Sequence, residues 1–483
     1  MNIARFSRFI PTALRPSWER FSQSSTAHRL AGGAFWATVA AVASRVAALV
    51  TSIIVARTVG PAGFGELGTV QGTIGMLGVF AGLGLGMTAT KYVATYLQSD
   101  CGRASRLIGL SSLLSWICGV LLGIVLVILA PWIATRILGA PELVIYLQAA
   151  SLYLLFSSVN GAQQGVLYGF EAFKEIAVVN IVSGVINLVC TVLGARWWGV
   201  LGAVCGMSVT QAFTCLFTFV AVRRKARERN LNLSYRGCWS ERHVIWSFSA
   251  PALLSSVLVT PALWVCNSIM VNQPNGFVEA GIFNAANQWR QAILFFPTTL
   301  AAVTLPMLSG FHGGRNMKSY RRVLLVSLAL SLVSALLVAF PVVAFSSVIM
   351  GGYGHAFVAG APVLSLLSMV AVVMAGLNVV GQTIACEGRM WIGALLNMLW
   401  GTVLIGSYYM LRQQGAQGFG TANLIAYGFH LINSLIYVYW SWNKRGLAGE
   451  TPAAGEDRPA GTVGECQTQQ PAEILIQEGT KYV

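Results

Sequence analysis

The sequence predicts an all-α polytopic membrane protein. Hydrophobic residues occupy 55% of its 483 positions and charged residues only 10%, whereas soluble chains carry about 25% charged residues. Apolar stretches of the roughly 20 residues that a helix needs to cross a bilayer recur along the whole chain. They lack the alternating pattern of barrel strands, so each stretch is interpreted as a transmembrane helix.

We count twelve such stretches, six in each half of the chain. They cover residues 31–56, 65–90, 107–130, 143–168, 176–197, 199–221, 245–271, 281–309, 323–346, 362–386, 390–411 and 418–440. The ends of helices predicted in this way are defined only to within about 2 to 4 residues.

The distribution of Lys and Arg orients these helices, because cytoplasmic loops retain positive charge during insertion. With the N-terminus in the cytoplasm, all but six of the 31 basic residues fall on that side or in the tails. The exceptions are Arg57, Arg136, Arg196 and Arg412 on the outside, and Arg45 and Arg290 within spans. We therefore expect a multi-pass membrane protein with both termini in the cytoplasm. Topology signals and contact with anionic membrane lipids explain the net charge of +15, and no nucleic-acid partner is expected.

Matched residues divide the chain into two halves. The spacing is 216 positions for Glu171 and Glu387, for Gly199 and Gly415, and for Gly202 and Gly418, and it is 218 for Gly63 and Gly281. Because six is an even number, both halves begin on the same side and are parallel repeats. The predicted units are a basic cytoplasmic segment (1–30), a six-helix bundle (31–221), a basic cytoplasmic linker (222–244), a second six-helix bundle (245–440) and a disordered cytoplasmic tail (441–483).

Two arginines within predicted spans are the strongest candidates for a binding site. Arg290 lies roughly 14 Å below the outer end of its span at 1.5 Å per residue, and Arg45 lies at a similar depth in the opposite half. Burying an arginine near the bilayer centre costs at least about 2.5 to 3.5 kcal/mol, so such a residue faces a cavity or a partner. No Asp or Glu occupies the middle of a predicted span. An anionic ligand is therefore the expected counterion.

Amide side chains surround one of these arginines. Asn284, Asn287 and Gln291 follow i, i+3, i+7 spacing and share a helix face, with Arg290 three residues from Asn287. Together with Gln71 they form a predicted substrate site, in which amides would form hydrogen bonds with a polar ligand and guanidinium groups would bind its anionic part. Alternatively, amides join neighbouring membrane helices through hydrogen bonds of about 0.6 kcal/mol. This interpretation is preferred for Asn180, Asn187, Asn378 and Gln382, while Gln71, Asn160, Gln163 and Gln164 are weaker site candidates.

The first predicted hairpin carries a recognisable motif. Residues 53–96 include Ala56, Arg57, Gly60, Pro61, Phe64 and Gly65, then a Gly-Leu-Gly stretch at 82–86, then Lys91 and Tyr92. This segment resembles the opening of prokaryotic polysaccharide-export flippases, the O-antigen and exopolysaccharide repeat-unit translocases of the MATE-like MOP superfamily. The similarity covers roughly residues 30–440.

The resemblance implies a V-shaped pair of six-helix bundles around a central cavity that opens alternately to either side. It also implies a function: moving undecaprenyl-diphosphate-linked oligosaccharides from the inner to the outer leaflet for O-antigen, capsule or exopolysaccharide synthesis. The lipid-linked glycan and membrane lipids are the expected partners, and polysaccharide polymerase or export components are further candidates.

Three alternatives are open at this point. A lipid II flippase and a cation-coupled small-molecule exporter belong to the same superfamily, but coupled exporters usually need a carboxylate within the membrane. The third is a membrane glycosyltransferase or polymerase. The sequence has no nucleotide-binding loop, metal cluster or nucleophile triad, so we expect no catalytic residue, metal or cofactor. The identity of the glycan and the driving force are not predicted.

Overall fold

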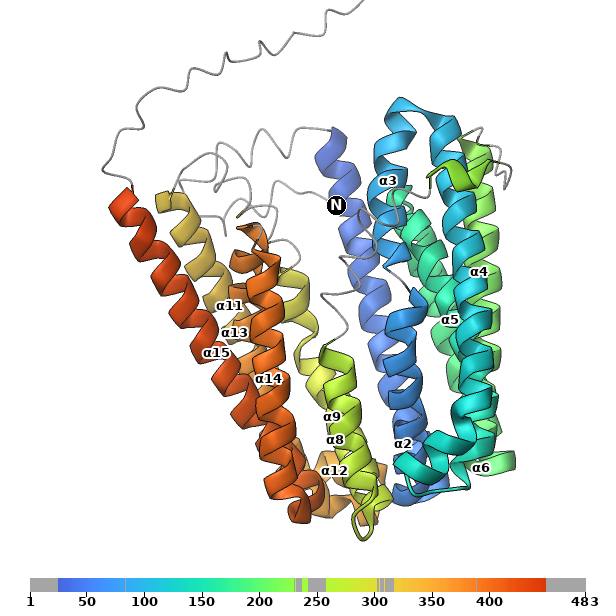
Figure 1. Ribbon diagram of the computed structural model, residues 1–483, viewed down its shortest axis with the longest axis vertical. Coiled ribbons are helices and arrows are strands. Elements are labelled where there is room, and N and C mark those ends of the chain that lie inside the picture. Colours follow the sequence, from blue (N-terminus) through green and yellow to red (C-terminus); the bar gives the residue numbers. More distant parts are fainter. Residues whose placement is uncertain are drawn as a thin grey trace, which may run out of the picture. The chain divides into compact units, whose positions relative to one another are not determined.

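The computed structural model describes residues 25–82, 84–229, 231, 237–241, 258–301, 304, 308, 317–387 and 389–448. Within these ranges the chain is helical and forms no strand, which confirms the predicted all-α class (Figure 1). Most of the predicted basic segment (1–30) and the tail beyond residue 448 lie outside the described residues.

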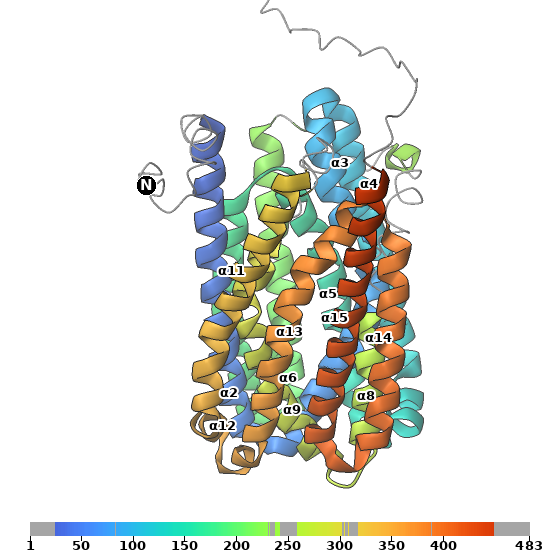
Figure 2. The ribbon, with the colours of Figure 1, turned by 90° about the vertical axis from the view of Figure 1, so that its left-hand side faces the viewer.

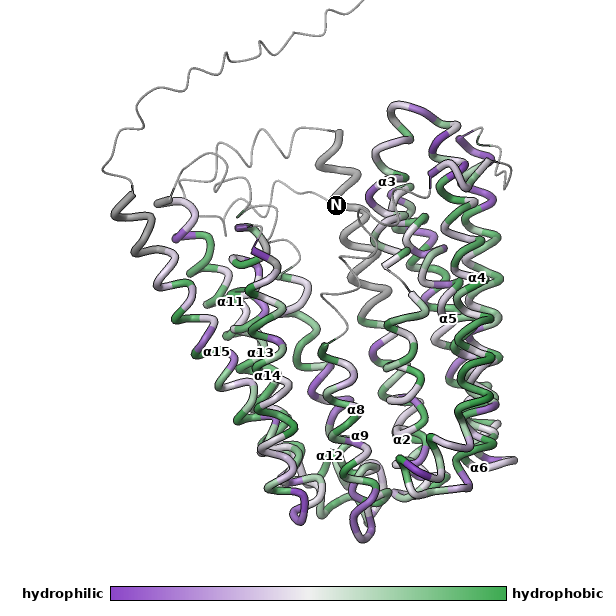
Figure 3. Tube along the Cα trace, in the orientation of Figure 1, coloured by the Kyte–Doolittle hydropathy of each residue, from purple (hydrophilic) through white to green (hydrophobic). Residues whose placement is uncertain are grey.

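The first half contains five long helices. They are α2 (Ser25–Gly82), α3 (Leu85–Ser99), α4 (Cys101–Trp132, continued by a π-helical turn at Ile133–Ile137), α5 (Leu143–Gly169) and α6 (Phe173–Glu228). Two of them contain a break in the helical backbone, at Gly60 in α2 and at Trp198 and Gly199 in α6. The two spans predicted at 176–197 and 199–221 are therefore the two arms of α6. Hydrophobic residues run along most of α4, as Figure 3 shows.

The second half begins with a short 3-10 turn and continues with helices of varied length. They are Cys238–Glu241, α8 (Val259–Val271), α9 (Gly276–Ile293), α11 (Met317–Ala344), α12 (Ser346–Tyr353), a 3-10 helix at His355–Gly360, α13 (Ala361–Cys386), α14 (Met390–Leu411), a 3-10 turn at Arg412–Gln414 and α15 (Gly415–Ala448). In the described part of the chain, seven helical segments are long and apolar enough to cross a membrane. Some of these segments are long enough to cross twice, and the spans predicted at 245–271 and 281–309 include residues outside the described ranges. The count of twelve therefore stays a prediction.

One pair of matched glycines has the same unusual backbone conformation. Gly199 has φ 58° and ψ −135°, and Gly415 has φ 55° and ψ −129°. Only glycine adopts these angles at low cost, because it has no Cβ. Each of the two residues ends one apolar helix segment and begins the next. This agreement supports the internal repeat, while the division into two six-helix bundles remains a prediction.

Helices α2 and α9, which lie far apart in the sequence, pack side by side (Figures 1 and 2). A Cβ at Gly65 of α2 would overlap the carbonyl oxygen of Phe277, and one at Gly281 of α9 would overlap the carbonyl oxygen of Pro61. Glycine at both positions therefore allows the two backbones to touch, as small residues do at membrane helix interfaces. The close approach brings the polar face of α9 against α2.

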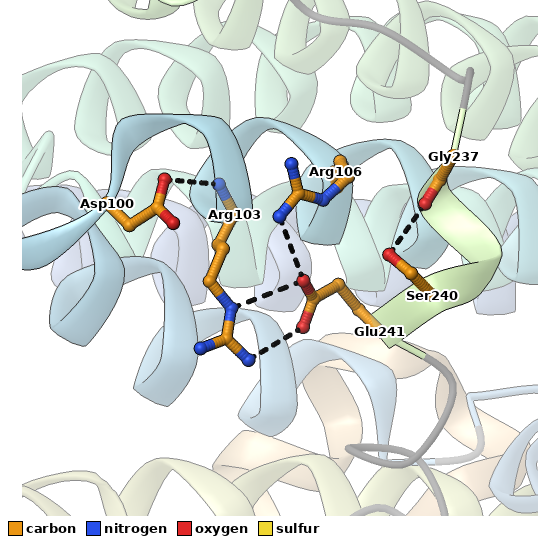
Figure 4. Close-up of polar contacts among 6 residues, drawn as sticks. All are labelled: Asp100, Arg103, Arg106, Gly237, Ser240 and Glu241. Atoms are coloured by element: carbon orange, nitrogen blue, oxygen red, sulfur yellow. Dashed lines mark hydrogen bonds and ion pairs between the residues drawn. The ribbon is translucent and has the colours of Figure 1, made fainter.

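The predicted linker between the halves differs from its expected form at its start. Helix α6 continues to Glu228, so the first residues of the predicted linker are helical. A short turn that follows, Cys238–Glu241, contacts the beginning of α4 (Figure 4). Glu241, whose side chain is 4% exposed, accepts hydrogen bonds of 3.3 Å from Arg103 and Arg106. These contacts hold the described part of the linker, Cys238–Glu241, against α4 of the first half.

Candidate functional site

A cavity of about 340 Å³ lies where α2, α8 and α9 meet. Five of the six residues predicted for the substrate site line it, namely Gln71, Asn284, Asn287, Arg290 and Gln291. Its apolar wall includes Phe64 and Phe283, together with Phe419 of α15, which stacks on Phe283 with ring centroids 4.3 Å apart. The cavity thus combines amides, a guanidinium group and aromatic rings.

The amides of α9 reach the cavity because α2 has a glycine opposite them. A Cβ at Gly68 would overlap the side chain of Asn284. The Nδ2 atom of Asn284 and the Oδ1 atom of Asn287 are buried and have no hydrogen-bond partner among the described residues. An unpaired buried polar group costs roughly 1 to 3 kcal/mol. These two atoms are therefore suited to a ligand that hydrogen-bonds, such as a sugar.

Arg290 is the most deeply buried charge of the cavity, with 8% of its surface exposed. Its Nε and Nη1 atoms have no hydrogen-bond partner among the described residues. None of the ion pairs found in that part of the chain involves Arg290 or Arg45. Arg290 thus offers two donors and an unpaired positive charge, which is the arrangement that binds phosphate oxygens.

Arg45 reaches the same region from α2 without lining the cavity. Its Nη1 atom donates a hydrogen bond of 3.0 Å to Oε1 of Gln291. Gln291 follows Arg290 directly on α9, so the bond places Arg45 beside the turn of α9 that contains Arg290. Arg45 is therefore bonded to the site through a residue that lines it.

The remaining amide candidates divide between the cavity and helix contacts. Gln71 lines the cavity and donates to the sulfur of Met207 at 3.3 Å. Asn160 is buried and accepts a hydrogen bond of 2.9 Å from Thr218, which joins α5 to the second arm of α6. Asn160 therefore has the structural role that was the alternative for amides in membrane helices.

Two cavity residues of α8 were not among the predicted site residues. Trp264 donates to Thr73 at 3.0 Å, and Asn267 donates to Thr69 at 3.2 Å. Both line the cavity, and the bonds hold α8 against α2. Their i, i+3 spacing in an otherwise apolar helix is a signal of a shared face, and it is visible in the sequence as Trp-Val-Cys-Asn.

Within the described residues, no group of three or more His, Cys, Asp or Glu side chains is placed to hold a metal ion. The donors that line the cavity are amide, guanidinium and indole groups. Their chemistry is hydrogen bonding and electrostatic attraction of anions.

A protein family and several known proteins are similar to this chain in sequence. The family model described as "polysaccharide biosynthesis protein" matches residues 30–312. The chain is 26% identical over 408 residues to the EPS I polysaccharide export inner membrane protein EpsE of Ralstonia nicotianae, covering 80% of this chain and 88% of that protein. It is 24% identical over 292 residues to the lipid III flippase of Escherichia coli, covering 60% and 69% of the two chains.

Solved structures show the same fold at low sequence identity. A multidrug resistance MATE family transporter of the MOP superfamily superimposes with a TM-score of 0.70 at 17% identity, covering 85% of this chain and 96% of that chain. The eukaryotic MATE transporter AtDTX14 superimposes with a TM-score of 0.65 at 15% identity, covering 83% and 93%. The chain therefore belongs to the polysaccharide biosynthesis protein family and has the fold of a MATE-like membrane transporter.

Proposed function

We propose that this protein is a flippase that moves undecaprenyl-diphosphate-linked oligosaccharide repeat units from the inner to the outer leaflet of the bacterial cytoplasmic membrane. The product would supply O-antigen, capsule or exopolysaccharide synthesis. The family match and the two relatives, one a polysaccharide export protein and one a lipid III flippase, support the substrate class. The observation that carries the proposal concerns Arg290, whose guanidinium group is buried in the cavity. This group has two donors without a partner and forms no ion pair among the described residues.

The cavity chemistry suits the headgroup of such a substrate. The donors of Arg290 would bind the diphosphate, because guanidinium and phosphate groups form paired, charge-assisted hydrogen bonds. Asn284, Asn287 and Gln71 would bind sugar hydroxyls. The aromatic rings of Phe283 and Trp264 would pack against the apolar faces of the sugar rings. Alternating access of this cavity to the two sides of the membrane would complete the transport cycle.

The two alternatives of the same superfamily differ in their demands on the site. A cation-coupled exporter usually needs a carboxylate beside its substrate, and the residues that line the cavity include no Asp or Glu among those the structure describes. Lipid II has the same diphosphate chemistry as the proposed substrate, so the cavity alone does not separate the two glycans. The similarity to export and lipid III proteins favours the polysaccharide branch.

The proposed topology completes this function. The halves 31–221 and 245–440 would be parallel repeats that rock against each other, with both termini in the cytoplasm. The substrate cavity would lie between them, since α2 belongs to the first half and α8 and α9 to the second.

Deletion of the gene tests the proposal. We expect lipid-linked oligosaccharide to accumulate on the inner leaflet and the surface glycan to disappear, and we expect a plasmid copy of the wild-type gene to reverse both effects. Extracted undecaprenyl-linked glycans would be identified by mass spectrometry. Accumulation of lipid II alone, or an unchanged lipid-linked pool, would contradict the proposal.

A further inference from the structure

A second cavity, of about 420 Å³, lies between the two arms of α6. We call it the α6 groove and define it by Lys174, Val178 and Val182 of the first arm and Phe217, Val220 and Arg224 of the second. Val178, Phe217 and Val220 are exposed at the surface of this apolar helix pair. The groove shares no lining residue with the substrate cavity.

The two arms of α6 are in contact beside the break that joins them. Near the break at Gly199, a Cβ at Gly194 would overlap the carbonyl oxygen of Gly202, so the backbones are in contact. Further along, Thr214 donates a hydrogen bond of 2.8 Å to Ser183. Beyond that bond, Val178 and Val182 of the first arm and Phe217 and Val220 of the second line the groove.

The open end of the groove has a positively charged rim. Lys225 forms ion pairs of 2.8 Å with both Glu175 and Glu228, the two carboxylates of the rim. Both carboxylates therefore already have a cationic partner. The side chain of Arg224 is 76% exposed, and its Nε atom pairs with Glu228 at 3.2 Å. No ion pair found among the described residues involves Lys174. The rim therefore has a surplus of positive charge beside an apolar groove.

We propose that the α6 groove binds an anionic phospholipid of the membrane. The phosphate would lie between Lys174 and Arg224, and one acyl chain would lie along Val178, Val182, Phe217 and Val220. The argument is charge complementarity: basic pockets between membrane helices at the cytoplasmic surface bind anionic headgroups, and a groove walled by exposed apolar side chains accommodates a hydrocarbon chain. The site is separate from the substrate cavity. Its position at the cytoplasmic surface rests on the topology proposed above and not on the transported substrate.

Native mass spectrometry of the purified full-length protein tests this site. The protein in detergent is titrated with phosphatidylglycerol and, separately, with phosphatidylcholine of the same acyl chains. We expect tighter binding of phosphatidylglycerol. The double variant Lys174→Gln, Arg224→Gln should lose this preference, by roughly five-fold in affinity for each charge removed.

Two further variants separate the groove from general effects of charge. Arg223→Gln removes the neighbouring cation, which lies over the ring of Phe219 at 4.6 Å and does not line the groove, so its lipid preference should equal that of the wild type. Val178→Trp keeps every charge and fills the groove, so it should weaken binding of both lipids. Equal thermal stability of all variants would show that they are folded.

Three results would overturn the proposal. One is an unchanged phosphatidylglycerol preference in the double variant, and another is an equal loss in Arg223→Gln. The third is displacement of phosphatidylglycerol by undecaprenyl phosphate at equimolar concentration, because the groove would then hold the polyprenyl carrier and not a membrane phospholipid.

Discussion

The guanidinium group of Arg45 donates a 3.0 Å hydrogen bond to the side-chain oxygen of Gln291, a residue 246 positions away in the sequence. The bond connects α2 to α9 and uses Gln291 as an acceptor. The next residue toward the N-terminus, Arg290, keeps two donors without a partner among the described residues. The two arginines therefore differ in their contacts, since Arg45 bonds across to α9 beside the cavity, whereas two atoms of Arg290 have no partner among the described residues.

Replacing Arg290 with Ala should abolish glycan export while leaving protein abundance close to normal. Hydrogen bonds to charged groups contribute about 1.5 to 3 kcal/mol each, so we expect transport to fall by at least roughly ten-fold. Arg290→Lys should retain part of the activity, because the charge survives and the paired phosphate geometry does not. Surface glycan and immunoblotted protein are measured together. Arg412→Ala, which removes a cation stacked on Tyr409 outside the cavity, is the control and should behave as the wild type. Full glycan display in Arg290→Ala would contradict a role of Arg290 in binding the ligand.

A double-mutant cycle on Arg45→Ala and Gln291→Ala should show coupling. Each single change removes the same hydrogen bond, so the double variant should lose less thermal stability than the sum of the two single variants. The coupling energy should be about 1 to 3 kcal/mol, the range for a partly buried bond to a charged donor. Thermal unfolding in detergent provides the measurement. Strict additivity would show that the bond contributes nothing to the contact between α2 and α9.

Gly65→Ala should destabilise the protein by about 1 to 3 kcal/mol, the usual cost of overpacking. The new methyl group would overlap the carbonyl oxygen of Phe277, and neither backbone can give way without separating α2 from α9. Gly161→Ala is the matched control, since it lies in α5 and nothing is within 4 Å of its Cβ position. The control should be neutral or slightly stabilising because alanine favours helix. Equal midpoints of thermal unfolding for the two variants would argue against the close packing of α2 and α9.

Gly199→Ala and Gly415→Ala should both destabilise the protein, because both glycines have nearly the same φ and ψ. Gly415→Ala should cost more, since its Cβ would also overlap the side chain of Glu279, whereas nothing lies within 4 Å of the Cβ position at Gly199. Alanine at such angles costs about 1 to 3 kcal/mol. Gly406→Ala is the control: this glycine lies inside α14, has ordinary helical φ and has open space at its Cβ position. Thermal unfolding of the three variants checks the expectation, and a neutral result at Gly199 would speak against equivalent turns in the two halves.

Glu241→Gln should loosen the linker from the first half of the protein. The carboxylate is buried and accepts from both Arg103 and Arg106 (Figure 4). Because the arginines keep some contact with water, the loss should be below the 3 to 5 kcal/mol of a fully buried pair. Trypsin should cut the basic linker several-fold faster in this variant, as followed by gel electrophoresis. Glu228→Gln removes a more exposed carboxylate that pairs with Arg224 and Lys225 within α6, so it should change the cleavage rate little. Equal rates in both variants would mean that Glu241 does not restrain the linker.

The polar stripe of α9 illustrates how far sequence reasoning reaches into the site. The spacing of Asn284, Asn287 and Gln291 predicted a shared face, and the structure places all three at the cavity. Asn160 has a similar local sequence context, yet it bonds to Thr218 of α6 instead. Helical periodicity shows which residues share a face, but it does not identify the neighbouring helix. The sequence therefore could not show whether an amide lines a cavity or contacts another helix.

The amino-acid sequence by itself determined the fold class, the presence of membrane-crossing helices and the concentration of polar groups on α9, because hydropathy and helical spacing act over a few turns of chain. It also marked the turns at Gly199 and Gly415, since only glycine tolerates their backbone angles. The tertiary structure alone decided that Arg45 meets Gln291, that Trp264 and Asn267 complete the cavity, and that Glu241 binds Arg103 and Arg106. Those contacts join residues more than a hundred positions apart, and they depend on which helix surfaces fit together closely enough for their side chains to meet.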